Sequence, residues 1–382
     1  MKRIMINEIC KVYDGPHATP NKTEYGPIYL GIDAITEDGM LDATQFAHLS
    51  EEDYIKWTKR VIPQENDIVF SYEATLGRYT MIPKGFHGCL GRRLAIIRNV
   101  SNKINTRWLY YYFRSPEWTS FIRNQTVKGS TVDRISVEDF PKYTVPLIPI
   151  GKQNRIVDVL DKIDRRIANN KKINDYLCSQ IQLLFSYLFN LSSIPKSWTK
   201  GVLTDIANIT MGQSPSGDSY NILGNGYPFY QGSTDFGAIF PTIRVYTNKP
   251  SRFASVFDTL LSVRAPVGSL NIAYENCCIG RGLASVHGKY NNNTFVRYLL
   301  KNNRWYFDNI NNSGTTFGSI TKNYLFDMPI VIPSSKLVAT FEQKANLMEQ
   351  QIYKNEQQTR ELQNLHNWLL PMLMNGQATI EN

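Results

Sequence analysis

The amino-acid sequence predicts an α+β protein built as an internal repeat, in which two similar mixed α/β domains are separated by two long helices. Three observations support this fold class: short motifs that occur twice in the same order, two globular segments rich in short apolar runs, and two long heptad patterns. The predicted boundaries are 1–150 for the first domain, 151–195 for the first helix, 196–335 for the second domain and 336–382 for the second helix.

The repeat is clearest in a motif around a glycine and an arginine. Residues 89–95 read Cys-Leu-Gly-Arg-Arg-Leu-Ala, and residues 278–284 read Cys-Ile-Gly-Arg-Gly-Leu-Ala. Two further pairs keep the same order along the chain: 67–71 with 258–262, and 129–135 with 314–320. The period is too long for a solenoid of short repeats. Two similar domains in one chain therefore suggest a protein that does one job at two places.

The globular segments show short apolar runs between glycine, proline and asparagine residues, which is typical of short strands and loops. Strands are expected at 67–70, 94–97, 144–148, 259–263 and 329–332. Residues 106–113 and 294–300 instead read as amphipathic helices, so most of their aromatic side chains are expected to fill cores. Cys89 and Cys278 are expected to be core residues as well.

The two long helices carry the clearest periodicity. Apolar residues follow a heptad seam from Ile156 to Leu188, and adding 185 to each position gives a second seam from Phe341 to Leu373. Both seams become polar in the middle, at Asn170, Asn174, Asn355 and Thr359. Antiparallel pairing would bring these polar positions into one layer. Parallel pairing would align them too, but it is harder to reconcile with two domains at opposite ends, so the helices are predicted to form an antiparallel coiled coil with pseudo-two-fold symmetry. The alternative is that each polar pair faces solvent or another subunit.

One seam position fits poorly. His366 falls where the heptad pattern requires an apolar residue, and its neighbour Leu365 is expected to take its place.

The basic residues are concentrated in matching parts of the two copies. The chain has a net charge of +9, and residues 78–134 hold 11 Lys and Arg against two acids, while residues 244–304 hold nine against two. Residues 33–73, by contrast, carry ten acids and three bases. One basic region in each copy points to a polyanionic ligand.

The sequence shows no signature of an active site of its own. It has no phosphate-binding loop, no dinucleotide-binding fingerprint, no Asn-Pro-Pro-Tyr tetrapeptide of an adenine methyltransferase, and no metal-ligand spacing among its five cysteines and five histidines. The start of the chain has no apolar signal segment, and no apolar run is long enough to span a membrane. We expect a cytoplasmic protein that is not an enzyme by itself and binds no metal.

Two loop motifs join the repeat and the long helices in pointing to a known family. Residues 14–20 read Asp-Gly-Pro-His-Ala-Thr-Pro, and in the second copy 211–215 read Met-Gly-Gln-Ser-Pro, followed by Pro-Phe-Tyr-Gln-Gly-Ser at 228–233. In these features the whole chain resembles the specificity subunit of type I restriction–modification enzymes, and the loops resemble the early loops of that family's target recognition domains. No single motif is decisive, but their order together with the repeat is.

The resemblance implies a non-catalytic subunit that gives sequence specificity to a larger complex. Each target recognition domain would bind one half of a bipartite, asymmetric site on double-stranded DNA. The helices would set the gap between the half-sites and dock two methylation subunits, with two restriction subunits joining for cleavage. S-adenosylmethionine, ATP and Mg would be bound by those partners and not by this chain. The second helix, with four bases and five acids over 336–382, lacks a basic face to match the first, so the two docking surfaces are expected to differ.

Phosphate contacts from Lys and Arg would supply most of the affinity for DNA, and a few side chains at base edges the specificity. The residues expected to contact DNA are loop and basic positions in both copies: Tyr72, Arg78, Arg92, Arg93, Lys128, Ser130, Arg134, Gln213, Ser214, Gln231, Arg264, Arg281, Thr315 and Thr316.

Two other functions stay open from the residues alone. A stand-alone DNA-binding regulator would need neither methylation partners nor an unfilled docking surface. An enzyme with an unrecognised active site, such as a nuclease, would modify DNA without partners.

Overall fold

The computed structural model describes residues 2–127, 133–190, 195–311, 318–378 and 380. The chain divides into two compact units: unit 1 is Met1–Ala168 with Thr359–Asn382, and unit 2 is Asn169–Gln358. Each unit therefore contains one globular domain and part of each long helix. The predicted boundaries place both helices outside the domains, whereas each compact unit includes part of both.

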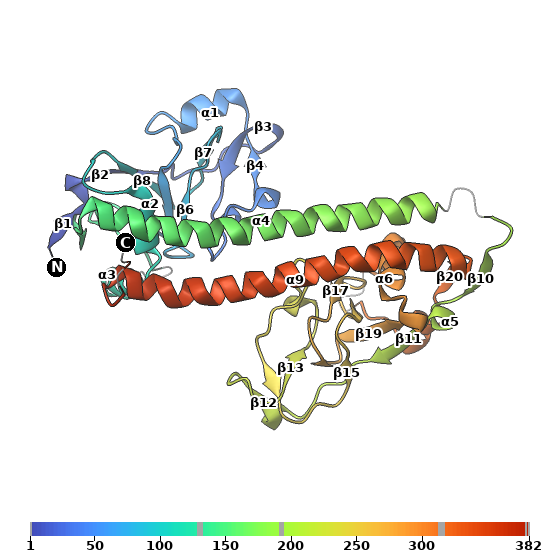
Figure 1. The fold of residues 1–382 in the computed structure, drawn as a ribbon. Helices are drawn as coiled ribbons and strands as arrows, with labels where there is room; N and C mark the ends of the chain where they lie inside the picture. The colour runs from blue at the N-terminus through green and yellow to red at the C-terminus, as the bar shows by residue number, and fades with distance from the viewer. Residues whose placement is uncertain (1, 128–132, 191–194, 312–317, 379, 381–382) are drawn as a thin grey trace. The chain divides into compact units, whose positions relative to one another are not determined.

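The globular part of unit 1 is built on two small sheets (Figure 1). An antiparallel four-stranded sheet has the order β2-β8-β5-β6, and a three-stranded sheet has the order β4-β3-β7, with β3 and β7 parallel. A separate pair, β1 with β9, is antiparallel. The strands are β1 (Arg3–Met5), β2 (Cys10–Asp14), β3 (Thr23–Leu30), β4 (Ala47–His48), β5 (Ile68–Ser71), β6 (Tyr79–Met81), β7 (Gly88–Leu90), β8 (Leu94–Asn99) and β9 (Thr144–Pro146).

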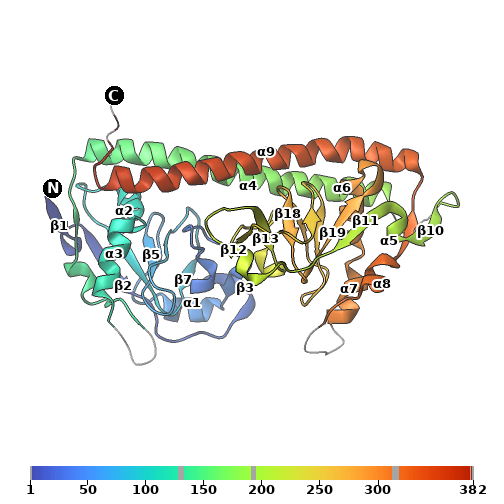
Figure 2. The ribbon, with the colours of Figure 1, turned by 90° about the horizontal axis from the view of Figure 1, so that it is seen from below.

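The helices of this domain are short. They are α1 (Glu51–Trp57), α2 (Thr106–Phe113) and α3 (Pro116–Gln125), with 3-10 turns at Ile6–Glu8, Ile32–Ala34, Ala43–Gln45 and Phe140–Lys142. Helix α1 lies against β3 and β7, as Figure 2 shows. Helix α2 covers the larger sheet and buries six consecutive side chains, Trp108 to Phe113, in the main core of the unit. The aromatic residues of this segment are core residues, as predicted.

Unit 2 repeats this plan with unlike details. Its antiparallel sheet β11-β19-β16-β17 corresponds to β2-β8-β5-β6, the parallel pair β13-β18 corresponds to β3-β7, and β10-β20 corresponds to β1-β9. The strands are β10 (Thr199–Val202), β11 (Ala207–Met211), β12 (Tyr220–Asn221), β13 (Tyr227–Tyr230), β14 (Tyr246–Thr247), β15 (Phe253–Ala254), β16 (Thr259–Ser262), β17 (Leu270–Ile272), β18 (Cys277–Ile279), β19 (Leu283–Gly288) and β20 (Pro329–Ile332). The short helices are α5 (Leu203–Ile206), α6 (Asn293–Asn302), α7 (Arg304–Asn311) and α8 (Lys322–Phe326), with 3-10 turns at Gly217–Ser219, Ser233–Asp235 and Lys289–Asn291. The predicted internal repeat and α+β class are confirmed.

The repeated motif at 67–71 and 258–262 has a structural explanation. Asp67 and Asp258 are buried, and each accepts a hydrogen bond from the backbone three residues earlier, Gln64 N at 2.8 Å and Ser255 N at 2.9 Å. Each is also paired with a basic side chain on the neighbouring strand, Arg98 on β8 or His287 on β19. These aspartates close the turn that leads into β5 and β16, so the same turn recurs in both domains.

The long helices α4 (Ile150–Leu188) and α9 (Ser335–Met374) pair antiparallel in both units. In unit 2, Asn355 Nδ2 donates to Asn174 Oδ1 at 2.8 Å, and Asn170 Nδ2 donates to Gln358 Oε1 at 3.1 Å. Asn170, Asn174 and Asn355 are 1%, 5% and 6% exposed. The predicted polar layer is therefore present, and its amides bond across the seam.

The expected substitution of Leu365 for His366 is wrong. Leu365 is 42% exposed, whereas His366 is buried at its own seam position in unit 1, with Nε2 3.6 Å from Asp164 Oδ1. Its ring also lies 6.0 Å from that of Tyr111, between centroids. Burial lowers the pKa of His366, which favours the neutral ring. A neutral imidazole packs as an aromatic side chain, so the heptad spacing continues without a shift.

Each domain is joined to the long helix that follows it through its own short helix. In unit 1, Gln153 of α4 accepts from Asn105 N at 2.7 Å at the start of α2. In unit 2, Glu342 of α9 accepts from Phe295 N at 2.7 Å in α6. In both joints a side chain of the long helix accepts from a backbone N–H near the start of the short helix, but one joint carries an amide and the other an acid.

The acid in the second joint is expected to make unit 2 pH-sensitive. Burial, reinforced by the nearby Glu349, raises the pKa of Glu342 to about 7, against the opposing effect of the Phe295 N–H. Since the unfolded chain releases this proton at lower pH, stability falls as pH rises from about 4.5 to about 7. Glu342→Gln should remove that fall and stabilise the protein at pH 8 by roughly 2 kcal/mol. Chemical unfolding between pH 4.5 and 8 measures it.

Glu361→Gln controls for the loss of one carboxylate, because Glu361 is exposed on the same helix. An unchanged dependence of unfolding free energy on pH in Glu342→Gln would contradict the assignment.

Candidate nucleic-acid interface

Three loops of unit 2 meet beside the parallel strand pair. The loop after β11 contacts the loop after β18, since Gln213 N donates to Ile279 O at 3.0 Å. The loop after β13 contacts it too, since Gly282 N donates to Gln231 O at 3.1 Å. Arg281 N also donates to Ser214 Oγ at 3.4 Å. The structure thus brings together Gln213, Ser214, Gln231 and Arg281, and all but the half-buried Ser214 are exposed.

The same loops meet in unit 1. Gly15 N, after β2, donates to Leu94 O at 3.0 Å, as Gly212 N does to Leu283 O at 2.9 Å in unit 2. Gly91 N donates to Leu30 O at 2.7 Å. Arg92 and Arg93 follow directly, the first exposed and the second half-buried. These two predicted residues therefore lie at the position that Arg281 and Gly282 occupy in unit 2.

The loops approach each other closely enough to require glycine. A Cβ on Gly15 would lie 2.3 Å from Leu94 O, and one on Gly212 would lie 2.1 Å from Gly280 O. Any larger residue would push the loop away from the turn that carries Arg92 or Arg281. The repeated glycines are scaffolding, and the side chains between them are free to differ.

The turns after β5 in unit 1 and after β16 in unit 2 join these loops, and we call the resulting group of loops in each unit its loop cluster. Tyr72 N donates to Arg93 O at 3.0 Å, and Val263 N donates to Gly282 O at 2.8 Å. The next residue forms an isolated β-bridge in each case, Glu73 with Arg134 and Arg264 with Ser319. Arg134 and Arg264 are exposed, so the predicted residues of these segments join the loop cluster.

Two predicted residues are placed unfavourably for contact with DNA. Tyr72 is 6% exposed and belongs to the main core of unit 1, with its hydroxyl bonded to Asp14. It is a packing residue. Arg78 is half-buried, and its Nη1 donates to Ile35 O at 2.8 Å, which ties the β5–β6 turn to the segment after β3. Lys128, Ser130, Thr315 and Thr316 lie outside the described residues.

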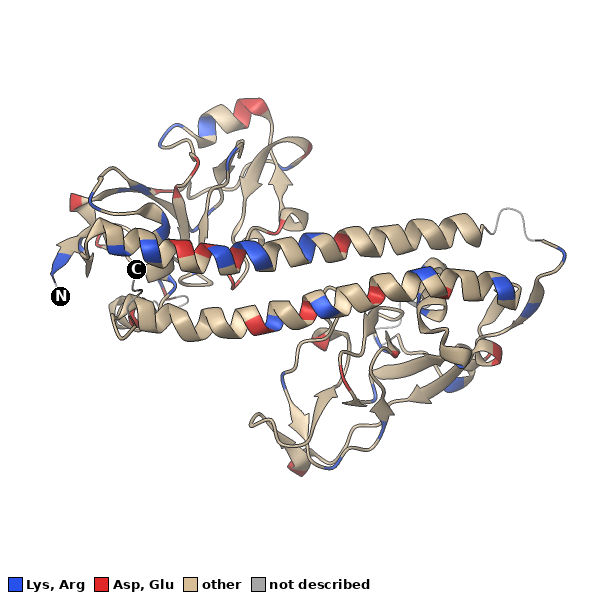
Figure 3. Ribbon diagram, viewed as in Figure 1, with Lys and Arg blue, Asp and Glu red and all other residues tan. Residues whose placement is uncertain are grey.

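Much of the basic charge counted in the sequence is used inside the domains. Arg98 pairs with Asp67, Arg107 with Asp161 at 2.5 Å, Arg244 with Asp235 and Arg297 with Glu349. Figure 3 shows acids and bases distributed over both domains. The number of bases available to a polyanion is therefore smaller than the composition of 78–134 and 244–304 suggests.

A cleft of about 440 Å³ opens beside the loop cluster of unit 1. Arg92 and Arg93 line it together with Ala74, and its other polar lining residues include Lys22, Asp33 and Gln45. Glu73, next to Ala74, pairs with Arg93 at 3.0 Å. Glu73 and Asp33 were not predicted as site residues. They are acids in an acidic segment of the sequence, and such residues carry no signal for DNA binding.

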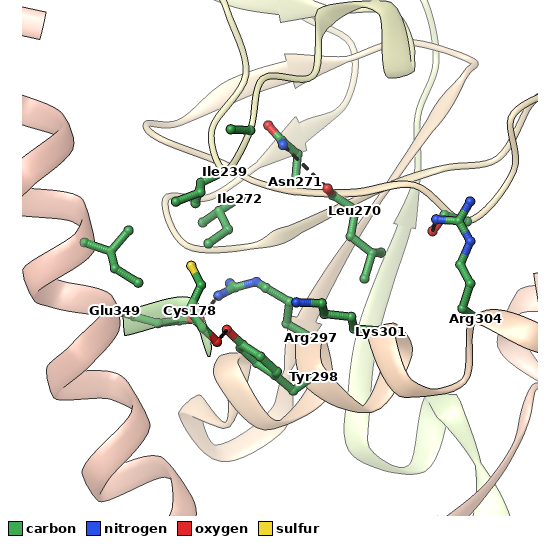
Figure 4. A pocket seen from close by; sticks show the side chains of 13 residues that line it. Cys178, Ile239, Leu270, Asn271, Ile272, Arg297, Tyr298, Lys301, Arg304 and Glu349 are labelled. Carbon is green, nitrogen blue, oxygen red and sulfur yellow. Dashed lines mark hydrogen bonds and ion pairs between the residues drawn. The ribbon is translucent and has the colours of Figure 1, made fainter. Parts of the chain in front are cut away.

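A second cavity, of about 430 Å³, lies in unit 2 between α6, β17 and both long helices (Figure 4). Arg297 crosses its wall and is fully engaged: Nε donates to Thr259 Oγ1 at 3.2 Å, Nη2 to Phe257 O at 2.6 Å, and Nη1 pairs with Glu349. This buried pair holds α6 to α9. It is a structural joint and not part of the loop cluster.

The comparisons with known proteins agree with this architecture. A family model described as the type I restriction modification DNA specificity domain matches residues 2–177. A putative type I restriction enzyme MjaX specificity subunit from Methanocaldococcus jannaschii is 27% identical over 400 residues, covering 97% of this chain and 91% of the relative. A putative type I restriction enzyme specificity subunit from Haemophilus influenzae is 25% identical over 120 residues, 31% of this chain and 29% of the relative.

Over nearly its whole length, this chain is similar to a putative type I restriction enzyme specificity subunit, and its first half matches the specificity-domain family. The fold is shared with the crystal structure of a type I restriction–modification S subunit from M. genitalium, at 15% identity and a TM-score of 0.57 over 98% of this chain and 96% of that one. In the part of the chain that the structure describes, no helix has both the length and the apolarity to cross a membrane.

Arg281 gives a direct test of the loop cluster in unit 2. If its exposed guanidinium contacts a phosphate, Arg281→Ala should weaken DNA binding and reduce the slope of log affinity against log salt by about one unit. The measurement is the dissociation constant for duplex DNA over a salt series. Lys336→Ala is the control, because Lys336 is an exposed base in the first turn of α9. An unchanged slope in Arg281→Ala would place the side chain away from phosphate.

Proposed function

We propose that this chain is a type I restriction–modification specificity subunit that recognises a bipartite, asymmetric DNA site, with each globular domain binding one half. The observation that carries the proposal is the recurrence of one backbone cluster with unlike side chains. Both domains place a loop after the first sheet strand, a Gly-Arg turn and a β-bridged turn together, but the exposed residues are Arg92 and Arg134 in one and Gln213 and Arg281 in the other. Two domains with the same backbone arrangement but different exposed side chains are suited to bind two different DNA sequences.

In this proposal the chain contributes no chemistry. Methylation subunits would bind S-adenosylmethionine, and restriction subunits would bind ATP and Mg. The long helices would set the gap between the half-sites. Helix α4 has 39 residues, a length of about 58 Å, and a helix of that kind suits a rigid spacer.

The proposed docking surface for the methylation subunits lies at the end of each long helix. Residues 176–190 and 362–380 contain no charged residue, and Figure 3 shows the last turns of both helices without acids or bases. Exposed apolar side chains lie there at matching positions: Leu183 in α4 and Trp368 in α9, 185 residues apart, are 62% and 57% exposed. Tyr187 on α4 is 83% exposed. Large apolar side chains on an uncharged helix face are typical of an interface.

One such surface in each unit would hold one copy of the same partner, which gives two methylation subunits per chain. A stand-alone regulator would have no use for these surfaces, so they favour the subunit over that alternative.

Exchange of one domain tests the proposal. Residues 1–149, which end just before α4, are replaced by the corresponding domain of another family member, and the chimera is co-expressed with its methylation subunit. One half of the methylated sequence should change while the other half and the adenine modification persist. Methylome sequencing measures this, with the unaltered chain as control. A chimera that is active but changes both halves, or neither, would contradict independent reading.

The number of bound methylation subunits tests the docking surfaces. Trp368→Asp introduces a charge into the uncharged end of α9 and should reduce the complex from two methylation subunits to one, because the surface on α4 is unaltered. Native mass spectrometry of the purified complex gives the stoichiometry. Gln357→Asp is the matched control, since Gln357 is exposed on α9 outside the uncharged segment. Two subunits retained by Trp368→Asp would show that docking occurs elsewhere.

A further inference from the structure

The Glu73–Arg93 pair of unit 1 has the chemistry to recognise one base pair. Arg93 Nε lies 3.0 Å from Glu73 Oε1, and the two side chains are 36% and 29% exposed, respectively. No further hydrogen-bond partner of the Arg93 guanidinium is present among the described residues, so its terminal amino groups can donate to a ligand. This half-buried pair therefore offers acceptor and donor groups side by side.

The backbone on both sides of this pair is strained. Ala74, next to Glu73, has φ +67°, and Arg93 has φ +68°. Residues with a Cβ rarely adopt this left-handed region, and such strain is concentrated at functional sites. Both residues also line the 440 Å³ cleft of unit 1, where Arg92, Lys22 and Gln45 supply further polar groups.

The corresponding position of unit 2 carries a different pattern. Arg264 occupies the place of Glu73, since each follows the residue that donates to the Gly-Arg turn, and Gly282 occupies the place of Arg93. Unit 2 thus has one exposed base and no acid there. An ion pair needed only for folding would be expected in both copies of the frame, because the hydrogen bonds of the turn itself are the same.

A carboxylate on a DNA-binding surface is repelled by phosphate. It favours binding only where it accepts a hydrogen bond from a donor on a base. In the major groove, cytosine presents the N4 amino group as a donor, while its partner guanine presents O6 and N7 as acceptors. A carboxylate beside a guanidinium is the complement of that edge. Glu73 would accept from cytosine N4 and Arg93 would donate to guanine O6 or N7 of the same base pair.

We propose that Glu73 and Arg93 together read one C·G base pair in the half-site bound by unit 1. This inference rests on the proposed function, and it adds the residues and the base chemistry of one position. Arg264 and Gly282 give unit 2 no equivalent reader, so the two half-sites differ at this point of the frame.

The experiment uses the full chain co-expressed with its methylation subunit and determines the methylated sequence genome-wide. Glu73→Gln and Arg93→Lys should each relax the preference for C·G at one and the same position of one half-site, by about ten- to a hundredfold. The other half-site should be unchanged. Its retention shows that the variant is folded and assembled.

Glu117→Gln is the matched control, because Glu117 forms an exposed ion pair of similar kind with Arg3 at 3.3 Å and does not line the cleft. Unchanged base preferences in Glu73→Gln, or relaxation at different positions in the two variants, would overturn the inference while the bipartite recognition by wild-type chain stands. Failure of the wild-type complex to methylate a bipartite site would instead reject the proposed function.

Discussion

The register of the long helix pair is the constraint on which the rest of each unit depends. In unit 2 it is set by buried amides, because Asn174 and Asn355 satisfy each other at 2.8 Å only when these two positions are opposite. A shift along the seam would leave buried donors and acceptors unpaired, which costs more than an equivalent apolar mismatch. The globular domain then takes its place from this register, since α6 contacts α9 through Glu342 and Glu349.

Structural features could be predicted where the sequence pattern is periodic or occurs twice. The heptad seams, the amphipathic segment 106–113 and the recurring Asp and Gly-Arg motifs all report local backbone or burial, and these properties depend on neighbours in sequence. The His366 expectation failed because hydropathy treats histidine as polar, whereas burial beside Tyr111 favours its neutral ring. The polarity of a titratable group is decided by its surroundings and cannot be read from its type.

The loop cluster was predictable only in part, for a similar reason. Arg281 and Gln231 lie together in unit 2 because they follow strands whose ends meet, and Arg92 holds the position of Arg281 in unit 1. The burial of Tyr72 was not predicted, because nothing in the sequence shows to which face of the turn its ring points. The number of Lys and Arg in the basic segments is larger than the number free to bind a polyanion. An arginine such as Arg98 is neutralised by Asp67, and that ion pair depends on pairing between strands distant in sequence.

The division of the chain into units bears on the order in which the protein can fold. Unit 2 is continuous in sequence, whereas unit 1 is assembled from residues on both sides of it. Leu370, Leu373 and Met374 are buried in the core of unit 1 with residues such as Ile156 and Leu160. During synthesis, a ribosome therefore makes all of unit 2 before it makes residues 359–382, the segment that closes unit 1. Of the two domains, the one made earlier is therefore completed later, and its apolar helix face stays uncovered until residues 359–382 have been made.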